Sequence, residues 1–392
     1  MKKIIRYFHL NNIGIFELLF AFYPIIAGYK YSLPMFAIVL LAFDVWILFF
    51  KRKKIVFDKK IVILFVYVFC HELFLLATLP PTPAYFVNNF LSYLLVVVSI
   101  PIISSGLDFQ KFVGALYFVS LICLGGLIYH FLVISAGGEV HPIKLPFMPE
   151  MESTSRLYDV MKRPSSFFWE PQSYCSFMFI PLFLAFKEKK ILWAFTIIFS
   201  LLLSGSTTGI IMSFVVIAIY IFTQGLSYKT KYGILLLSVP VFFLFINLSL
   251  FQVGREKMMD TDINDNSRLY NGPVLVSRMQ VNEFILGVHD FSASDYYMSG
   301  KTGSSSYLID KYDTIYISTF WHVIVKFGLI GLIIYMSLYL VPLIRNRSLL
   351  LYLGPLIATL FSNPDFLGAY FAFEFIFIYS FLLSNNRNYS SR

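Results

Sequence analysis

The sequence is poor in charge. Only 14% of its 392 residues are charged, whereas 58% are hydrophobic. Soluble globular domains usually carry about 25% charged residues, so this composition excludes an ordinary water-soluble fold. The apolar residues also fall into long runs of roughly 18–25, the length that crosses a hydrocarbon core about 30 Å thick. The scarcity of charge therefore indicates a membrane protein.

Cysteine is also scarce. Cys70, Cys123 and Cys175 lie within or at the edge of apolar runs, and their spacing fits neither a metal site nor a disulfide framework. We therefore expect no metal and no other cofactor. The sequence has no internal repeat, no low-complexity linker, and no small-residue cleavage site after its basic start. The first apolar run is predicted to be an uncleaved anchor, and residues 1–392 are predicted to form a single polytopic membrane domain.

The apolar runs predict an all-α protein, a polytopic integral membrane helical bundle of about 12 transmembrane helices. The runs do not alternate every second residue as strands would, and a helix satisfies its own backbone within lipid. The predicted spans are 13–29, 32–50, 61–79, 85–105, 112–136, 174–186, 191–204, 207–223, 232–250, 316–343, 348–363 and 367–384. The short sixth and seventh runs leave the number of spans uncertain by about one or two.

The positions of lysine and arginine predict how the chain is oriented in the membrane. If the N-terminus lies inside, nearly every short basic connection also lies inside, with Lys30 as the exception. The net charge of +9 is then explained by cytoplasmic loops and does not call for nucleic-acid binding. Both termini are predicted to be cytoplasmic. Two long loops, 137–173 and 251–315, are predicted to be extracytoplasmic and partly folded.

The first of these loops ends in a mixture of charge, proline and aromatics. Residues 163–174 read Arg-Pro-Ser-Ser-Phe-Phe-Trp-Glu-Pro-Gln-Ser-Tyr. Pro164 and Pro171 argue against one continuous helix and predict a tight turn at the membrane surface. Arg163 and Glu170 would lie at the lipid–water boundary. A capping turn with an Arg–Glu salt bridge and an aromatic belt explains the same pattern.

The second loop carries Arg268 and Arg278. On one helix, two residues ten apart point roughly 80° away from each other, yet both can still reach one ligand. The planar guanidinium of arginine binds phosphate through two parallel hydrogen bonds. The pair is therefore a candidate phosphate clamp. The alternative is two solvated arginines in an acidic loop.

Ionisable residues inside the predicted spans are functional hypotheses by default, although each can also be a satisfied polar contact between helices. They are Glu17, Asp44, His71, Glu72, His130, His322, Lys326 and Glu374. Glu17 and Asp44 are expected to hydrogen-bond between helices. His322 lies in the outer half of its span and can reach a site there, whereas the pair His71–Glu72 would suit a transporter.

Residues 163–174 resemble the signature of Wzy-type O-antigen polymerases, which runs arginine, small residues, phenylalanine, glutamate-proline, a small residue and an aromatic. Weaker matches follow in the family's order, and together they cover residues 160–340. They are 203–209 (Leu-Ser-Gly-Ser-Thr-Thr-Gly), 266–268 (Asn-Ser-Arg), 284–288 (Phe-Ile-Leu-Gly-Val) and 327–331 (Phe-Gly-Leu-Ile-Gly).

The resemblance implies a metal-independent glycosyltransferase of the cell inner membrane, with its long loops in the periplasm. Such an enzyme transfers a growing glycan from undecaprenyl diphosphate onto the next lipid-linked repeat unit. Its expected partners are undecaprenyl-diphosphate-linked oligosaccharide and a chain-length regulator in the membrane, and not nucleic acid.

The leaving diphosphate gains negative charge, which arginines must stabilise when no metal is present, and a carboxylate or imidazole must accept the proton of the attacking hydroxyl. Arg163, Glu170 and Arg268 match the family's functional positions, and His322 is a second candidate base. The expected catalytic residues are Arg163, Glu170, Arg268 and His322, and the expected substrate-binding residues are Arg278, Trp169, Tyr174 and His289.

Two other functions remain open. The related O-antigen ligases, which join glycan to lipid A core, often carry a histidine where this chain has Ile317 and an arginine where it has Thr207. Both departures favour a polymerase. A transporter, such as the flippase of the same pathway, would need polar residues near the midplane and often shows inverted repeats. His71–Glu72 fits that expectation, but the sequence shows no repeat.

Overall fold

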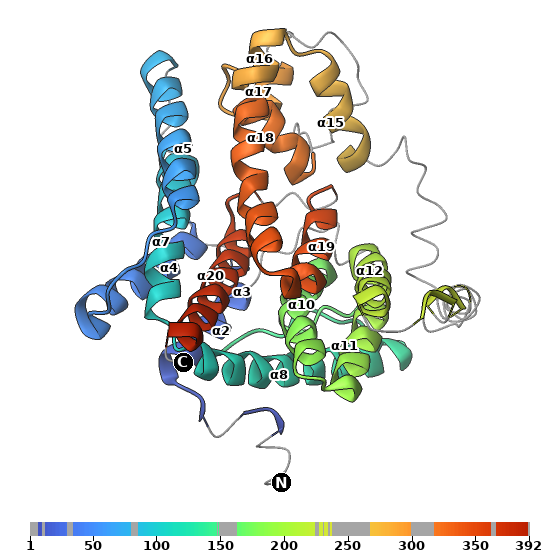
Figure 1. The fold of residues 1–392 in the computed structure, drawn as a ribbon. Helices are drawn as coiled ribbons and strands as arrows, with labels where there is room; N and C mark the ends of the chain where they lie inside the picture. Colours follow the sequence, from blue (N-terminus) through green and yellow to red (C-terminus); the bar gives the residue numbers. More distant parts are fainter. Residues whose placement is uncertain are drawn as a thin grey trace. The chain divides into compact units, whose positions relative to one another are not determined.

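The computed structural model describes most of the chain. The described residues are 7–9, 12–29, 34–79, 85–146, 148, 163–223, 227–229, 231–233, 236, 267–298, 317–361 and 366–390, without the side chains of residues 88, 267–270 and 386–390. Within these ranges the secondary structure is entirely helical, with no strand (Figure 1). The predicted all-α class is therefore confirmed for the described part of the chain.

Four helical stretches are long and apolar enough to cross a membrane. They are α5 (Lys59–Thr78), the stretch Asn89–Gly106 that contains α7 (Ser92–Gly106), α8 (Phe109–Ser135) and α18 (Thr319–Arg345). Each coincides with a predicted span. A helix rises 1.5 Å per residue, so these four have the length that a bilayer requires.

Shorter helices coincide with parts of most of the other predicted spans. They are α2 (Ile15–Ala21), α3 (Tyr23–Ile26), α4 (Met35–Trp46) with η2 (Ile47–Lys51), η3 (Phe86–Leu91), α10 (Pro171–Lys187), α11 (Ile191–Leu203), α12 (Thr207–Thr223), α19 (Leu350–Thr359) and α20 (Ala369–Ser390). The first predicted span is divided between α2 and α3, with Pro24 in the first turn of α3. Predicted span 232–250 lies almost entirely outside the described residues. Among the described residues, the structure thus supports four spans by length and composition, and the other predicted spans are not confirmed.

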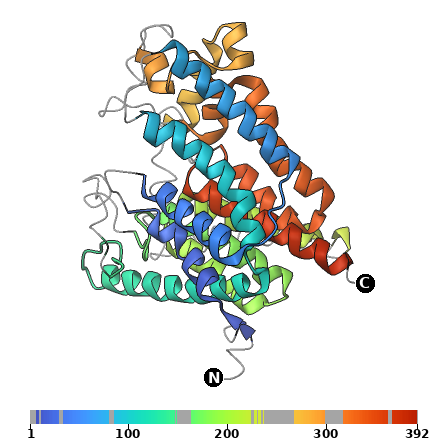
Figure 2. The same ribbon diagram turned by 90° about the vertical axis from the view of Figure 1, so that its left-hand side faces the viewer.

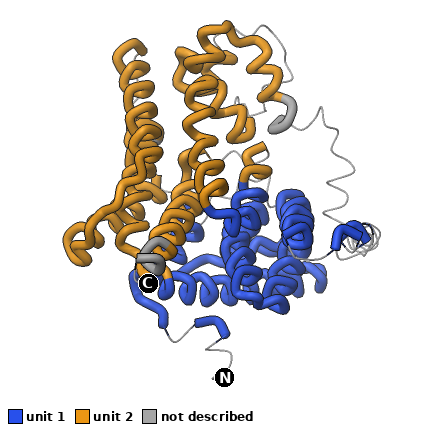
Figure 3. The backbone as a smooth tube through the Cα atoms, in the orientation of Figure 1, with its two compact units in different colours: residues 1–30, 110–261, 346–356 blue, residues 31–109, 262–345, 357–392 orange. Residues whose placement is uncertain are grey.

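The backbone groups into two compact units (Figure 3). Unit 1 comprises residues 1–30, 110–261 and 346–356, and unit 2 comprises 31–109, 262–345 and 357–392. The sequence analysis expected one domain. Because each unit is assembled from three separate stretches, no single boundary in the sequence divides them, and composition along the chain carries no sign of the division.

In unit 1, α10 packs against both α11 and α12. In unit 2, α4 and α20 pack on α7, and α5 lies along α18 (Figure 2). The predicted role of Asp44 is confirmed, since its carboxylate accepts a 2.5 Å hydrogen bond from Ser99 and so joins α4 to α7. A buried carboxylate without such a partner would be costly. Glu17, on α2, is buried as well.

The described part of the predicted second loop is folded. It contains α15 (Ser267–Ser277), α16 (Val281–Leu286) and α17 (Ala293–Met298), all of which pack on α18. We call residues 267–298 the second-loop layer. A capping box begins α16, in which the side chains of Gln280 and Glu283 satisfy exposed backbone N–H groups.

Candidate functional site

The signature segment 163–170 forms a turn in unit 1. Ser166 lies in the left-handed region with φ of 58°, and Glu170 is extended as the N-cap of α10. Pro171 follows at the first helical position, where its missing N–H costs nothing. The chain therefore turns between the two prolines, as their spacing predicts.

The turn is anchored on α8. The backbone N–H groups of Ser165 and Ser166 both donate to His130 Nδ1 at 3.3 Å, and the Ser166 hydroxyl donates to the carbonyl of Cys123 at 2.7 Å. Gly126 makes this approach possible, because a Cβ there would lie 2.5 Å from Ser166 Oγ. His130 thus positions the turn. The sequence marked His130 as an ionisable residue within a span but did not reveal its partners.

Arg163 begins the turn and is partly enclosed. Its Nη1 donates to the carbonyl of Gly205 at 3.1 Å, in the connection between α11 and α12. Burial lowers the pKa of the Arg163 guanidinium, and the negative charge of Glu170 opposes that shift. Arginine nevertheless stays protonated in proteins. The site therefore holds a fixed positive charge within electrostatic reach of the Glu170 carboxylate.

The aromatic residues of the signature divide into packed and half-buried side chains. Phe168 is buried against Tyr174 and Phe177, at ring-centroid distances of 6.0 and 5.5 Å. Trp169 is half-buried and lies beside Gly28. Tyr174, predicted to bind substrate, is fully buried, and its hydroxyl donates to Ser200 Oγ at 2.8 Å. Tyr174 therefore packs between helices of unit 1, and its contact with substrate stays a prediction.

We expect Tyr174→Phe to lower stability slightly and leave substrate binding nearly unchanged. The substitution removes one buried hydrogen bond, worth about 1 kcal/mol, while Ser200 still donates to the Ile197 carbonyl. Thermal unfolding in detergent measures the first effect, and the KM for the lipid-linked donor that the family resemblance implies measures the second. A rise in KM of about tenfold without loss of stability would restore Tyr174 to the substrate site.

The predicted residues of the second loop lie in unit 2. Arg268 is in α15 by its backbone, and its side chain lies outside the described residues. Arg278 is exposed just after α15. His289 is exposed, with its Nε2 2.6 Å from the Thr78 hydroxyl and its ring 5.3 Å from that of Phe74. His289 thus joins the second-loop layer to the end of α5.

A break in α18 brings two motifs together. At Gly328 the backbone has φ of 66° and ψ of −172°, and the Val325 and Phe327 carbonyls bond outside the helix. Val325 O accepts from the Val288 N–H at 2.9 Å, and Phe327 O accepts from the Tyr67 hydroxyl at 2.7 Å. Such breaks persist in membrane helices only when neighbours satisfy the freed backbone groups.

Two glycines allow this contact. Gly287 has φ of 96°, and a Cβ there would lie 2.2 Å from Lys326 O; a Cβ on Gly328 would lie 2.3 Å from Ile285 O. The segments 284–288 and 327–331, which resemble two separate family motifs, therefore form one packed unit. Any larger residue at either glycine would force the backbones apart.

Beside the break lies a buried polar group in unit 2, the Glu72–Lys326 cluster, made of Glu72, Lys326, Tyr85 and His71. Lys326 Nζ lies 3.0 Å from Glu72 Oε1, and His71 Nδ1 lies 3.6 Å from the same oxygen. The Tyr85 hydroxyl donates to Glu72 Oε2 and accepts from Lys326 at 2.7 Å. The sequence analysis missed this pairing. The sequence did contain a signal for it, because opposite charges within apolar spans, such as Glu72 and Lys326, usually pair with each other.

His322 lies one helical turn before Lys326 on α18. Its ring stacks on Phe366 at 5.3 Å, and its Nε2 is buried with no hydrogen-bond partner among the residues described. Within the described ranges, no three His, Cys, Asp or Glu side chains are grouped as metal ligands. The predicted site residues thus fall into two sets: Arg163, Trp169, Glu170 and Tyr174 in unit 1, and Arg268, Arg278, His289 and His322 in unit 2.

Comparison of the chain with protein-family models, with curated proteins and with solved structures finds no match.

Proposed function

We propose that this protein is an integral-membrane glycosyltransferase that polymerises lipid-linked glycan repeat units, as its resemblance to Wzy-type polymerases implies. It acts from the cell inner membrane on undecaprenyl-diphosphate-linked oligosaccharide. The observation that carries the proposal is the signature turn. His130 anchors the backbone of the turn, and the Arg163 guanidinium donates to the Gly205 carbonyl, which places a positive charge within electrostatic reach of Glu170.

The chemistry suits these residues. The bond between the donor sugar and its diphosphate breaks, and a hydroxyl of the next repeat unit forms the new glycosidic bond. Arg163 and Arg268 stabilise the negative charge on the departing diphosphate. Glu170 or His322 accepts the proton of the hydroxyl. A fixed guanidinium is more effective here than a mobile one because it needs no reorganisation as the charge develops.

The packing of unit 2 supports the proposed topology. The C-terminal end of α5 contacts His289, and the N-terminal half of α18 contacts Val288, so these two helix ends lie on the same side as the second-loop layer. A second loop that faces the periplasm requires this arrangement. In the proposed orientation the second-loop layer faces the periplasm, and exposed Arg278 faces it as well.

A transporter is the second candidate, because one observation favours it. The Glu72–Lys326 pair is buried beside the broken helix α18, and discontinuous helices with polar groups at the break are typical of transporter binding sites. A transporter, however, needs no arginine–glutamate turn outside its spans.

An assay of the purified full chain in detergent separates these functions. Supplied with synthetic undecaprenyl-diphosphate-linked repeat units, a polymerase yields a ladder of longer glycans and free undecaprenyl diphosphate. A transporter yields no new bond, since detergent leaves no compartments. With lipid A core added, glycan joined to the core and no ladder would indicate a ligase. Folded protein that forms no ladder would contradict the proposal.

A further inference from the structure

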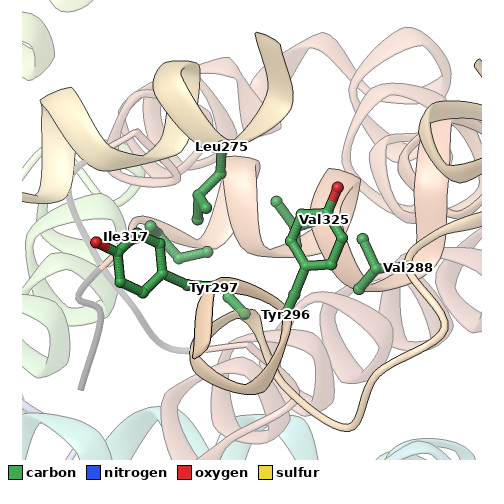
Figure 4. Close-up of a cluster of buried hydrophobic side chains, with 7 residues drawn as sticks. Leu275, Val288, Tyr296, Tyr297, Ile317 and Val325 are labelled. Carbon is green, nitrogen blue, oxygen red and sulfur yellow. The ribbon is translucent and has the colours of Figure 1, made fainter. Parts of the chain in front are cut away.

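The second-loop layer is attached to the helices of unit 2 through the Val288–Val325 backbone hydrogen bond, the His289–Thr78 contact, an apolar cluster and the ammonium of Lys326. The apolar contact is a buried cluster that joins α15, α17 and α18 (Figure 4). Its members are Leu275, Val288, Ala293, Tyr296, Tyr297, Ile317 and Val325. Apolar packing of this kind favours burial but is non-directional, so it leaves the exact placement of the layer to other contacts.

The side chain of Lys326, on α18, makes a polar contact with the second-loop layer. Its ammonium has three acceptors within hydrogen-bond or ion-pair distance: Glu72 Oε1 at 3.0 Å, the Tyr85 hydroxyl at 2.7 Å and the backbone carbonyl of Phe291 at 2.9 Å. Lys326 donates hydrogen bonds to the Tyr85 hydroxyl and the Phe291 carbonyl, and the Glu72 carboxylate is its ion-pair partner. The third acceptor is the important one, because Phe291 belongs to the second-loop layer and not to a membrane helix.

Phe291 and the segment before it make further contacts within unit 2. Its ring packs against that of Tyr85 at a centroid distance of 4.1 Å, and two residues earlier His289 contacts Thr78. Lys326 is itself held by Glu72, which is completely buried on α5. The hydrogen bonds and ion pair of a buried charged group are directional and costly to break, whereas apolar packing is not directional.

We propose that Lys326, oriented by Glu72, is a positioning residue that fixes the second-loop layer, and with it the segment that carries Arg268 and Arg278, in the geometry that binds the donor diphosphate. The catalytic part of this inference rests on the proposed function. The anchoring of the second-loop layer by Lys326 does not. Lys326 acts through Phe291 and touches no substrate.

The charge-swapped variant Glu72→Lys/Lys326→Glu tests the anchor. The swapped pair can attract as before, but a glutamate at position 326 cannot donate to the Phe291 carbonyl. We expect amide hydrogen exchange of residues 288–298 to rise about tenfold in this variant and in Glu72→Gln/Lys326→Met, which leaves no unpaired charge. Asp44→Asn is the matched control, because it removes another buried carboxylate of unit 2 that bonds only between α4 and α7. It should leave that exchange unchanged.

The kinetic readout separates positioning from loss of fold. In Glu72→Gln/Lys326→Met we expect KM for the lipid-linked donor to rise about fivefold or more with kcat nearly unchanged, whereas partial unfolding lowers the active fraction and leaves KM alone. The anchoring role of Lys326 is overturned if amide hydrogen exchange of residues 288–298 is unchanged in Glu72→Gln/Lys326→Met. It is also overturned if the charge-swapped variant protects these residues as well as the wild type does. Raised exchange in a chain that forms no polymer would support the anchor and refute the polymerase.

Discussion

Replacement of Arg163 by Ala is expected to abolish long glycan chains while single lipid-linked repeat units persist. The substitution removes the fixed positive charge beside Glu170 and the bond to the Gly205 carbonyl. Loss of one preorganised group that stabilises developing charge costs about 2.7–4 kcal/mol, or roughly 10²–10³ in kcat. Gel analysis of the glycan ladder in cells and kcat in the detergent assay measure the loss.

Two variants control this result. Arg163→Lys keeps the charge but loses the planar fork, so we expect it to retain part of the activity. Arg347→Ala removes an exposed arginine on the predicted cytoplasmic side and should leave the ladder unchanged. Normal ladders from Arg163→Ala, at normal protein levels, would refute the catalytic role of the turn and leave the capping-turn interpretation.

The single substitution Lys326→Met is expected to be the most destabilising change in unit 2. It leaves the completely buried Glu72 carboxylate without its cation. Removal of one partner of a buried ion pair costs about 3–5 kcal/mol, mostly because an uncompensated charge remains. Thermal unfolding of the purified chain in detergent should show a large loss of stability, with reduced yield.

The double variant Glu72→Gln/Lys326→Met should recover most of that stability. Both charges are gone, and a glutamine at position 72 can still accept from the Tyr85 hydroxyl. Buried pairs replaced together are often nearly neutral. A double variant as unstable as the single one would show that the pair, and not the unpaired charge, stabilises unit 2.

Much of the local structure could be predicted from the sequence. The apolar runs predicted α5, α8 and α18 closely, because a long, mostly apolar run satisfies its backbone in lipid only as a helix. Pro164 and Pro171 predicted the turn of the signature, because proline restricts its own φ and the conformation of the residue before it. Asp44 predicted a bond between helices, because a buried carboxylate needs a donor.

The number of spans was harder to predict. Hydropathy marks a segment as apolar but does not say whether it continues as one helix, and the predicted span 13–29 is divided into α2 and α3. Tyr174 shows the same limit for side chains. The sequence placed Tyr174 beside the signature but did not indicate that the neighbouring helix α11 supplies Ser200 as its hydrogen-bond partner.

The sequence by itself determined which apolar segments are helical and where the signature turns, since both follow from residues that are neighbours along the chain. Only the tertiary structure decided the partners: His130 with the signature turn, Gly287 with Gly328, and Glu72 with Lys326 and, through it, Phe291. These partners are far apart in the sequence. Their pairing depends on which helix faces meet when apolar surface is packed, and a hydropathy pattern contains no information about that choice.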